Sequence, residues 1–546
     1  MLNQEVLLIY PPSWIRVQPQ PPLGISTIAA ALRALGIVAH QVDLEVASYL
    51  DNKMFESPDD KSDLGALSDL ARVDDWVMDH AAEGTIEHSA VLMADRYRLD
   101  GFGYYGFSAM SHRQFASAVA LAHICKDRNP GCYVGIGGQF AIANAVGIST
   151  RYPVFDHVFA DSDYLSAAEV IAAAMKGLAG RSNSAPERVI RAVKEVPIEQ
   201  MPVPVVEESA LDLYERAQRA IYGLTSDTPI LKYLVMTGCP FRCVYCSRHE
   251  LEPYALKSAE KVGRELAEMK CQYDSRLFSL EANEINPSWR WLDALVGHLE
   301  RKRLGLEWYG YAVPRGFTPE RAALLRESGC RVLRFGVESG SSRLLRTMNK
   351  RFSPDDVDRA IRTCAEAGIW SHVNLIVGFP GETDDDIRLT LDLIERLGEW
   401  IDSARINPFY LHSATELYRE YARGGMLRKM DDLDVVRWEH DDSETWDRTA
   451  DLLAERVGRI FEALHGKGIG FTGGCMDLLL HSLVRLGEKQ RVKARLRDDY
   501  AYMFTSLPTP AILWRLYYPH SADCPYSDSW RDHAGRWGGV KDRILI

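Results

Sequence analysis

The chain has 546 residues, a formal net charge of −12 and 46% hydrophobic residues, which predicts a globular protein of two to four domains. The acidic balance, spread without a basic block, argues against a protein that grips a nucleic-acid backbone, and no stretch reaches the roughly 20 apolar residues of a membrane span. Ten cysteines are too few for a disulfide framework, so we expect a reducing, cytoplasmic setting.

The first 180 residues alternate between strand-like and helix-like segments. Apolar, β-branched runs predict five strands, near residues 5–14, 37–45, 101–111, 132–141 and 155–163. Five βα units of this kind predict a doubly wound, Rossmann-like domain over residues 1–180. Residues 51–100 form a charged insertion with some helical pattern.

The fourth predicted strand ends in a glycine-rich turn, Gly135-Ile136-Gly137-Gly138. Glycines there let a ligand approach the backbone closely. The turn does not match the G-x-G-x-x-G fingerprint, so a nicotinamide cofactor is not expected. A glycine turn without a ligand is the alternative. Residues 181–228, rich in serine, proline and charge, read as a linker.

A cluster of three cysteines follows the next strand. Cys239, Cys243 and Cys246 come directly after the apolar run 231–238, at the strand end where α/β folds place their chemistry. Thiolates suit iron–sulfur clusters or zinc, but structural zinc takes four ligands and the sequence has no second Cys-x-x-Cys. Three ligands suit a 4Fe–4S cluster with one open iron, and three incidental buried cysteines are the alternative.

Residues 229–420 alternate strand and helix six times. Strands are expected near residues 231–238, 276–281, 306–312, 331–340, 370–381 and 403–411. Helix signals separate them, for example Thr318 before a proline and Gly329 at the end. This pattern predicts a six-repeat (β/α)6 partial barrel, open on one side. Residues 421–546 predict a mostly helical domain, in which Cys475 and Cys524 stand alone.

The cysteine motif resembles the signature of a known family. The pattern C-x-x-x-C-x-aromatic-C, formed by Cys239, Cys243, Tyr245 and Cys246, resembles that of radical S-adenosylmethionine (radical SAM) enzymes. In that family the open iron is chelated by the amino and carboxyl groups of S-adenosylmethionine, and electron transfer cleaves the sulfonium to methionine and a 5′-deoxyadenosyl radical. The resemblance implies that the three cysteines are the catalytic residues and the metal ligands.

Downstream positions match the segments that contact S-adenosylmethionine in this family. "GVESG" resembles the motif of the fourth strand and "NLIVGFPGET" that of the fifth, whereas "LEAN" departs from the common Gly-Gly-Glu or Asp pair. The alternatives are a surface salt bridge for Glu338 and a solvated cation for Arg315. The resemblance assigns S-adenosylmethionine contacts to Tyr245, Glu281, Arg315, Glu338, Ser339, Ile376 and Gly378.

The N-terminal segments "YPPSW", "PPLGISTIAAALRALG", "GFSAM", "GIGGQ" and "FADSD" resemble the first domain of cobalamin-binding radical SAM enzymes. The resemblance covers about residues 1–420. The family's "GEGE" is "ADSD" here, and the D-x-H-x-x-G ligand motif is absent, which implies base-off cobalamin without a histidine beneath cobalt. The implied cobalamin contacts are Pro12, Gly24, Ser108, Met110, Gly137, Gly138 and Gln139.

The implied activity is a cobalamin-dependent radical SAM methyltransferase that acts on an unactivated carbon of a bulky natural product, peptide or tetrapyrrole. A radical cyclase with the same cofactors is the alternative, and a sensor without catalysis is a third reading. Methylthio transfer is disfavoured, because the enzymes that perform it carry a second set of three cysteines in their N-terminal domain. Here the first 238 residues hold only Cys125 and Cys132. The expected partners are a small-molecule or peptide substrate and an electron donor such as flavodoxin or ferredoxin, with no nucleic acid and no membrane.

Overall fold

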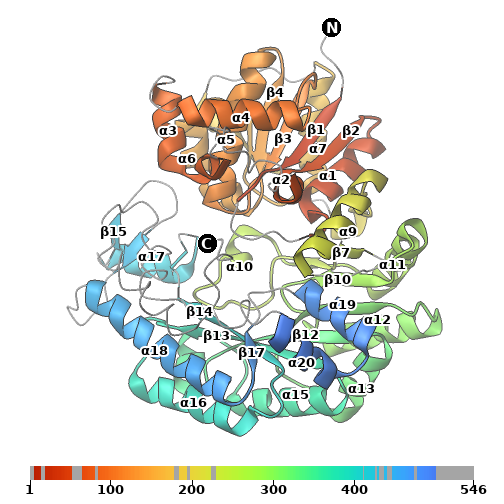
Figure 1. Ribbon diagram of the computed structural model, residues 1–546, viewed down its shortest axis with the longest axis vertical. Coiled ribbons are helices and arrows are strands. Elements are labelled where there is room, and N and C mark those ends of the chain that lie inside the picture. Colours follow the sequence, from red (N-terminus) through yellow and green to blue (C-terminus); the bar gives the residue numbers. More distant parts are fainter. Residues whose placement is uncertain are drawn as a thin grey trace. The chain divides into compact units, whose positions relative to one another are not determined.

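The computed structural model describes residues 5–13, 19–51, 64–79, 84–177, 184–192, 197–222, 229–409, 411–412, 414–424, 427–429, 436–438, 446–471 and 476–499. The chain divides into two compact units, Met1–Tyr233 and Leu234–Ile546 (Figure 1). Each unit is built around a parallel sheet, which confirms the expected α/β fold class.

The first unit contains a six-stranded sheet with the order β2-β1-β3-β4-β5-β6, in which every neighbouring pair is parallel. The strands are β1 (Val6–Tyr10), β2 (Ala39–Asp43), β3 (Tyr104–Ser108), β4 (Tyr133–Gly137), β5 (His157–Phe159) and β6 (Val189–Ile190). The five strands expected from sequence are present. The sixth, β6, lies in the segment that the sequence predicts to be a linker.

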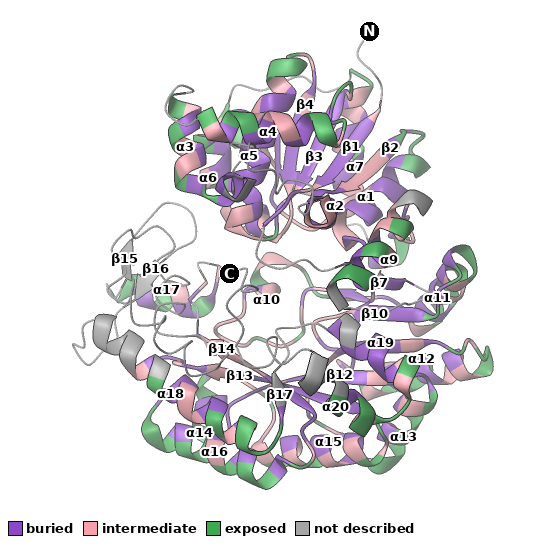
Figure 2. Cartoon of the chain, in the orientation of Figure 1, coloured by how far each residue is buried: buried purple, intermediate pink, exposed green. Residues whose placement is uncertain are grey.

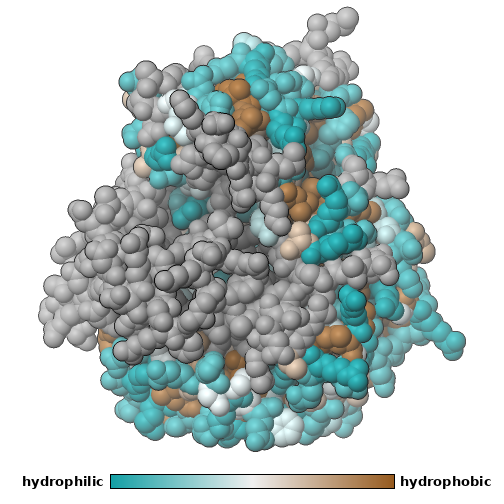
Figure 3. Space-filling view, viewed as in Figure 1, coloured by the Kyte–Doolittle hydropathy of each residue, from teal (hydrophilic) through white to brown (hydrophobic). Residues whose placement is uncertain are grey.

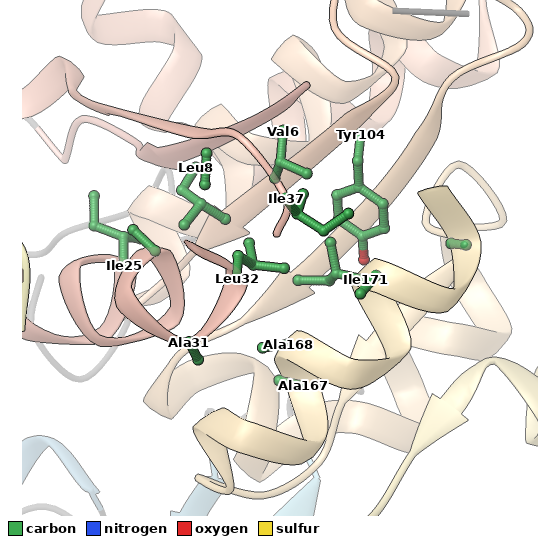
Figure 4. Packing of buried hydrophobic residues seen from close by; sticks show 14 of the residues in the cluster. Val6, Leu8, Ile25, Ala31, Leu32, Ile37, Tyr104, Ala167, Ala168 and Ile171 are labelled. Atoms are coloured by element: carbon green, nitrogen blue, oxygen red, sulfur yellow. The ribbon is translucent and has the colours of Figure 1, made fainter. Parts of the chain in front are cut away.

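Helices cover both faces of this sheet. The helices of the unit are α1 (Leu23–Ala34), α2 (Leu44–Asp51), η2 (Leu64–Ser68), α3 (Leu70–Met78), α4 (Gly84–Arg96), α5 (His112–Arg128), α6 (Gln139–Arg151), α7 (Tyr164–Met175), α8 (Ala185–Arg188), η3 (Ile198–Gln200) and α9 (Glu208–Tyr222). Val6 and Leu8 pack on α1 and α7, as Figure 4 shows. Leu7 and Ile9 alternate with them and are also buried, so the strands are apolar on both sides.

The charged insertion and the predicted linker both contribute to the core of this unit. The described part of the insertion, η2, α3 and α4, packs against α5 and buries Trp76 completely. Helix α9 packs against α2, where the Tyr214 hydroxyl donates to Asp43 Oδ2 at 3.1 Å. The prediction that residues 181–228 form a linker, made from their serine, proline and charge content, therefore missed strand β6 and the amphipathic helix α9.

The second unit contains a seven-stranded sheet with the order β17-β14-β13-β12-β11-β10-β7. Many residues of this sheet are buried (Figure 2). Its strands are β7 (Ile230–Leu234), β10 (Leu277–Glu281), β11 (Glu307–Ala312), β12 (Cys330–Glu338), β13 (Trp370–Val377), β14 (Ser403–Pro408) and β17 (Gly470–Phe471). Neighbouring strands from β10 to β17 are parallel. The six strands expected for the partial barrel are present in sequence order, and β17 adds a seventh at the edge.

Short polar caps start most helices of the second unit. Its helices are α10 (Arg248–Leu251), α11 (Ala259–Tyr273), α12 (Trp289–Arg301), α13 (Pro319–Glu327), α14 (Ser342–Thr347), α15 (Pro354–Glu366), α16 (Asp384–Leu397), α17 (Glu416–Arg423), α18 (Trp446–Gly466), α19 (Met476–Leu486) and α20 (Lys489–Asp499). Thr318 caps α13 as expected, and Ser353 and Thr383 form capping boxes at α15 and α16. These caps fix the residue at which each strand-end loop ends and the following helix begins.

Beyond residue 420 the described chain is mainly helical. Helices α18, α19 and α20 accompany one short hairpin of β15 (Leu427–Lys429) and β16 (Val436–Trp438). Helix α20 is held at the amino end of β14, because Lys489 and Lys493 each contact the Asp402 carboxylate at 2.8 Å. Cys475 and Cys524 lie outside the described residues.

The described surface that faces the viewer in Figure 3 is mostly hydrophilic, with hydrophobic residues in small separate groups. Among the described helices, none combines the length and the apolar composition that a bilayer crossing requires.

Candidate functional site

The cysteine motif occupies a loop that is closed at its base. Two-residue strands β8 (Met236–Thr237) and β9 (Ala255–Leu256) pair in antiparallel fashion on either side of it. Gly238 has a φ of +55°, and a Cβ there would lie 2.4 Å from the Glu252 carbonyl oxygen. Only glycine allows this approach, so Gly238 fixes the point at which the chain leaves the sheet and enters the loop.

The three cysteines are free thiols, each partly exposed. Burial raises the pKa of all three, whereas the nearby Lys350 charge lowers those of Cys243 and Cys246. No three His, Cys, Asp or Glu side chains of the described residues converge as they would around a single metal ion. A 4Fe–4S cluster is compatible with that spacing because each thiolate binds a different iron, and a cation beside the loop favours the thiolate form.

A buried ionic group supports the loop from the end of β12. Lys350 Nζ lies 2.9 Å from Glu338 Oε1, and the Tyr245 hydroxyl donates to the same oxygen at 3.1 Å. Burial alone would lower the pKa of Lys350, but the Glu338 charge outweighs it and raises that pKa. Burial and the Glu338 charge also raise the pKa of Tyr245, which stays a neutral hydrogen-bond donor. The carboxylate that sequence assigns to S-adenosylmethionine thus has two protein partners already.

Backbone contacts fix the loop further. Val244 N–H donates to the Met348 carbonyl at 3.2 Å, and Leu417 N–H donates to the Val244 carbonyl at 3.0 Å. Val244 and Tyr245 also pack against a buried apolar cluster made of Leu344, Met348, Phe379, Phe409, Leu411, Leu417 and Tyr421. The cysteines are therefore carried on a loop held from three strand ends, β12, β13 and β14, and preorganised for a rigid ligand.

Glu284 is a further acidic group in this loop region that sequence reasoning missed. The Cys239 thiol lies 3.2 Å from Glu284 Oε2, and burial raises the pKa of Glu284 to about 7. Glu284 follows the expected site residue Glu281 by three positions in "LEANE", which was the available sequence signal. Lys350 gave no such signal, since it lies on a loop after α14 and reaches the site only through the fold.

The structure brings some of the expected S-adenosylmethionine residues to the cysteine loop. Ile376 packs against Tyr245, and the Arg315 guanidinium lies 5.7 Å from the ring centroid of Phe241. Glu281 ends β10, and its carbonyl accepts a hydrogen bond from the Val235 N–H at 2.9 Å. All three therefore stand beside the loop or at its base.

Two of the expected residues make contacts elsewhere. The Ser339 hydroxyl lies 3.2 Å from Thr390 Oγ1 of α16, and Ser339 is buried. Gly378 has a φ of +83°, and a Cβ there would lie 2.7 Å from Leu453 of α18. The glycine therefore serves close packing of α18, and the serine serves packing of α16.

The expected cobalamin residues gather at the carboxyl ends of the strands in the first unit. Strand order reverses between β1 and β3, and ligands of open α/β sheets bind in the crevice at such a point. Pro12 follows β1, Met110 follows β3, and Gly138 follows β4 with a φ of +90°. A Cβ on Gly24 of α1 would lie 3.7 Å from the Ser108 hydroxyl, so that helix and β3 approach closely. Gly137 ends β4 and Gln139 begins α6.

A buried polar network ties these strand-end loops together. Gln114 donates to the Pro11 carbonyl and to Glu45, each at 3.0 Å, and accepts from the Met110 N–H at 2.8 Å. Ser13 donates to the other Glu45 oxygen at 2.6 Å. Sequence reasoning missed Gln114 and Glu45, because neither lies in a recognised motif. Their joint effect is to hold the loops after β1 and β3 in one arrangement.

Comparison with known proteins agrees with this architecture. Residues 233–394 match the model of the radical SAM superfamily. This segment is a radical SAM domain. It contains the cysteine loop and strands β10 to β13, so the expected radical SAM domain is confirmed, whereas the roles of the three cysteines stay a prediction.

Relatives extend the likeness beyond this domain. An uncharacterized methyltransferase of Pyrococcus horikoshii is 25% identical over 349 residues, which is 60% of this chain and 72% of that protein. A tRNA-2-methylthio-N(6)-dimethylallyladenosine synthase of a Jannaschia species is 26% identical over 292 residues, half of this chain and 56% of that enzyme. The chain thus spans little more than half of that enzyme.

Two solved structures share the fold over nearly the whole chain. The radical S-adenosylmethionine methyltransferase TsrM from Kitasatospora setae, solved with cobalamin and a 4Fe–4S cluster, matches with a TM-score of 0.63 at 15% identity over 91% of this chain and all of that chain. The cobalamin-dependent radical enzyme OxsB matches with a TM-score of 0.59 at 14% identity over 97% of this chain and 75% of that chain. At these identities the likeness is one of fold.

Proposed function

We propose that this protein is a cobalamin-dependent radical SAM enzyme that transfers a methyl group to an unactivated carbon of a bulky substrate. The observation that supports this most is the pairing, in one chain, of a strand-order reversal in the first sheet with a three-cysteine loop at the second. TsrM and OxsB share that fold along most of the chain.

The residues present fit the three groups that such an enzyme holds. Cys239, Cys243 and Cys246 would bind a 4Fe–4S cluster, and the crevice beside β1 and β3 would receive cobalamin. When bound, the cluster with S-adenosylmethionine supplies one-electron cleavage of a carbon–sulfur bond, and cobalamin supplies a methyl carrier.

The protein's own contribution is positioning. Lys350 places a largely buried positive charge near the cysteine thiols, and the Tyr245 hydroxyl donates to Glu338 beneath the loop. Gln114 and Glu45 hold the loops around the first crevice. Both the cysteine loop and this crevice are therefore ordered before a ligand binds, which lowers the entropy cost of binding. No single acid–base residue is required, because the hydrogen leaves the substrate as an atom.

Besides the substrate and S-adenosylmethionine, the proposed net reaction requires only an electron donor to balance. One S-adenosylmethionine gives up its methyl group and leaves as S-adenosylhomocysteine. A second is cleaved to methionine and deoxyadenosine, which carries away the substrate hydrogen. Two electrons, from a donor such as flavodoxin or ferredoxin, complete the balance. A cyclase would consume no methyl group, and that difference separates the two readings.

Product analysis under anaerobic conditions tests the proposal. Reconstituted protein with hydroxocobalamin, dithionite and methyl-labelled S-adenosylmethionine should retain the corrinoid on desalting and form deoxyadenosine. The variant with Cys239, Cys243 and Cys246 all changed to alanine should bind no cluster iron and form no deoxyadenosine. Cys271→Ala, at an exposed thiol of α11, is the matched control and should behave as the wild type.

Three outcomes would refute the proposal or one of its parts. A protein that retains no corrinoid has no cobalamin function, and about four irons per chain in the triple variant would place the cluster elsewhere. Once the natural substrate is identified, a product that is altered but carries no methyl label would show that the enzyme catalyses cyclisation and not methyl transfer. Methylthio transfer has little support, since Cys125 and Cys132 are both buried in the first unit.

A further inference from the structure

One face of the second sheet points toward the cysteine loop. Glu338 of β12 and Ile376 of β13 both contact Tyr245 of that loop. Side chains alternate between faces along a strand, and residues in register on neighbouring parallel strands share a face. Gly336 shares the Glu338 side, because a Cβ there would lie 2.7 Å from Glu338 Oε1. The register shifts between Gly336 and Glu338, so alternation is followed from Gly336, which is in register with Asn374, two residues before Ile376. The face that looks toward the loop therefore carries Gly336, Asn374 and Ile376.

Arg334 lies on this same face, two residues before Gly336 on β12. It is in register with Tyr311 of β11 and His372 of β13. The next step along the sheet pairs Gly336 with Asn374, and Asn374 with Arg405 of β14. The face below the cysteine loop is thus polar and carries two arginines, which is unusual for the inside of a sheet covered by helices.

Arg334 has no anionic partner within the described residues. It is 8% exposed, its Nε has no hydrogen-bond partner, and no described carboxylate forms an ion pair with it. Its guanidinium carbon lies 4.3 Å from the ring centroid of Tyr311. A cation–π contact orients the guanidinium but leaves the buried Nε–H without an acceptor among the described residues. By contrast Arg331 on the same strand pairs with Glu307, and Lys350 pairs with Glu338.

A buried guanidinium without a counter-charge is costly, and its planar fork of donors matches a carboxylate in two parallel hydrogen bonds. We propose that Arg334, oriented by Tyr311 and flanked by Asn374, is the subsite that binds a carboxylate of the substrate. This inference rests on the proposed function and narrows its substrate to a carboxylic acid.

A carboxylate in this enzyme could come from S-adenosylmethionine or from the substrate. In a radical SAM enzyme the first is fixed at the open iron, hence beside the cysteine loop. Arg334 precedes Glu338, which contacts that loop, by three steps of the sheet register, because β12 is bulged between Gly336 and Glu338, and this corresponds to about 10 Å along a strand. The position of Arg334 therefore favours the substrate as the source.

Ligand binding to the reconstituted holoenzyme, with S-adenosylmethionine present, tests this subsite. The probes are 4-fluorobenzoate and its neutral counterpart 4-fluorobenzamide, followed by fluorine NMR. Wild-type protein should bind the benzoate saturably and better than the amide. Arg334→Gln should weaken benzoate binding about ten- to a hundredfold, the worth of charge-assisted hydrogen bonds, and leave the amide unaffected. Arg334→Lys should fall between them, since it keeps the charge and loses the fork.

Controls distinguish substrate binding by Arg334 from a purely structural role of that residue and from binding of the S-adenosylmethionine carboxylate. Arg346→Gln, at an exposed residue of α14, should bind the benzoate as the wild type does. The melting temperature of Arg334→Gln should not fall, because an unpaired charge is removed, and its affinity for S-adenosylmethionine should be unchanged.

Three results would overturn the subsite. These are benzoate binding that is absent in the wild type, equal binding in Arg334→Gln, or a loss of S-adenosylmethionine affinity in that variant. Deoxyadenosine formation without substrate does not depend on the subsite, so failure of the proposed function is recognised separately.

Discussion

The buried carboxylate of Glu338 beneath the cysteine loop is compensated by two neighbouring side chains. Glu338 is 8% exposed and meets Lys350 and Tyr245 at one carboxylate oxygen. Removing one partner of such a pair costs more than the pair contributes, because the other charge stays buried. Replacing Lys350 is therefore expected to lower the stability of the folded protein even when no cofactor is bound.

Lys350→Met should lower the free energy of unfolding of the unreconstituted protein by about 3–5 kcal/mol, since it leaves the Glu338 carboxylate without a counter-charge. Urea denaturation measures this. The double variant with Glu338→Gln should recover part of the loss, and Lys302→Met at an exposed site should cost little. Strictly additive losses in the double variant would show that the two residues are not coupled.

Asp43 of the first unit provides a pH test. Burial raises its pKa to about 7, despite hydrogen bonds from the Val46 N–H and the Tyr214 hydroxyl, and the Glu45 charge raises it further. The unfolded chain releases that proton near pH 4. Between about pH 4 and pH 7 the folded state holds a proton that the unfolded state has lost, so stability falls as pH rises through this window.

Asp43→Asn should remove this component, which is on the order of 4 kcal/mol between the two ends of the window. Denaturation at a series of pH values compares the slopes for the two proteins. As pH rises from 4 to 7, the free energy of unfolding of the variant should increase relative to that of the wild type. Above pH 7 the difference between the two proteins should stay constant. Parallel slopes for both proteins would mean that Asp43 is ionised in the folded state.

At the scale of elements, the turn between β4 and α6 depends on one glycine. Gly138 has a φ of +90°, and a Cβ there would lie 2.4 Å from the Ala109 carbonyl oxygen. Phe140 N–H donates to that same carbonyl at 3.1 Å, so the two strand-end loops are joined at this point. A side chain would push the loops after β3 and β4 apart, at the crevice where cobalamin is proposed to bind.

Gly138→Ala should lower the melting temperature and weaken corrinoid retention, with strain of about 1–3 kcal/mol from the dihedral alone and more from the contact. Gly36→Ala is the matched control, because Gly36 has a φ of +75° and nothing within 4 Å of a Cβ. That control should cost about 1 kcal/mol and retain corrinoid fully. Equal effects of the two substitutions would show that the contact with Ala109 relaxes freely.

For the whole molecule, the two units should respond to different ligands. Hydrogen exchange of the full chain can follow this, since a ligand protects the amides that it orders. Cluster reconstitution should slow exchange in residues 238–254, and hydroxocobalamin should slow it in residues 108–114 and 137–142. Protection of only one set by both ligands would contradict the assignment of one site to each unit.

The order of most strands and helices, and the cysteine motif, could be predicted from the sequence alone. These are local properties: apolar runs set the strands, polar caps such as Thr318 set the helix starts, and the spacing of Cys239, Cys243 and Cys246 specifies a ligand set within one loop. The family model confirms the radical SAM domain, while the roles of individual cofactor contacts stay predictions. Composition misled where a weak local signal was overridden by packing, as for α9 and β6 in residues 181–228, and it did not predict the edge strand β17.

Contacts between residues far apart in the chain depend on the folded arrangement and could not be predicted from local sequence. Lys350 reaches Glu338, Gln114 joins Pro11 to Met110, and Arg334 takes its place under the cysteine loop through the register of β11, β12 and β13. No periodicity in the chain encodes such pairs, because the burial and the register that create them come from many strands at once. Whether a buried charge finds a partner is likewise settled by the fold, and that is what distinguishes Arg334 from Arg331 on the same strand.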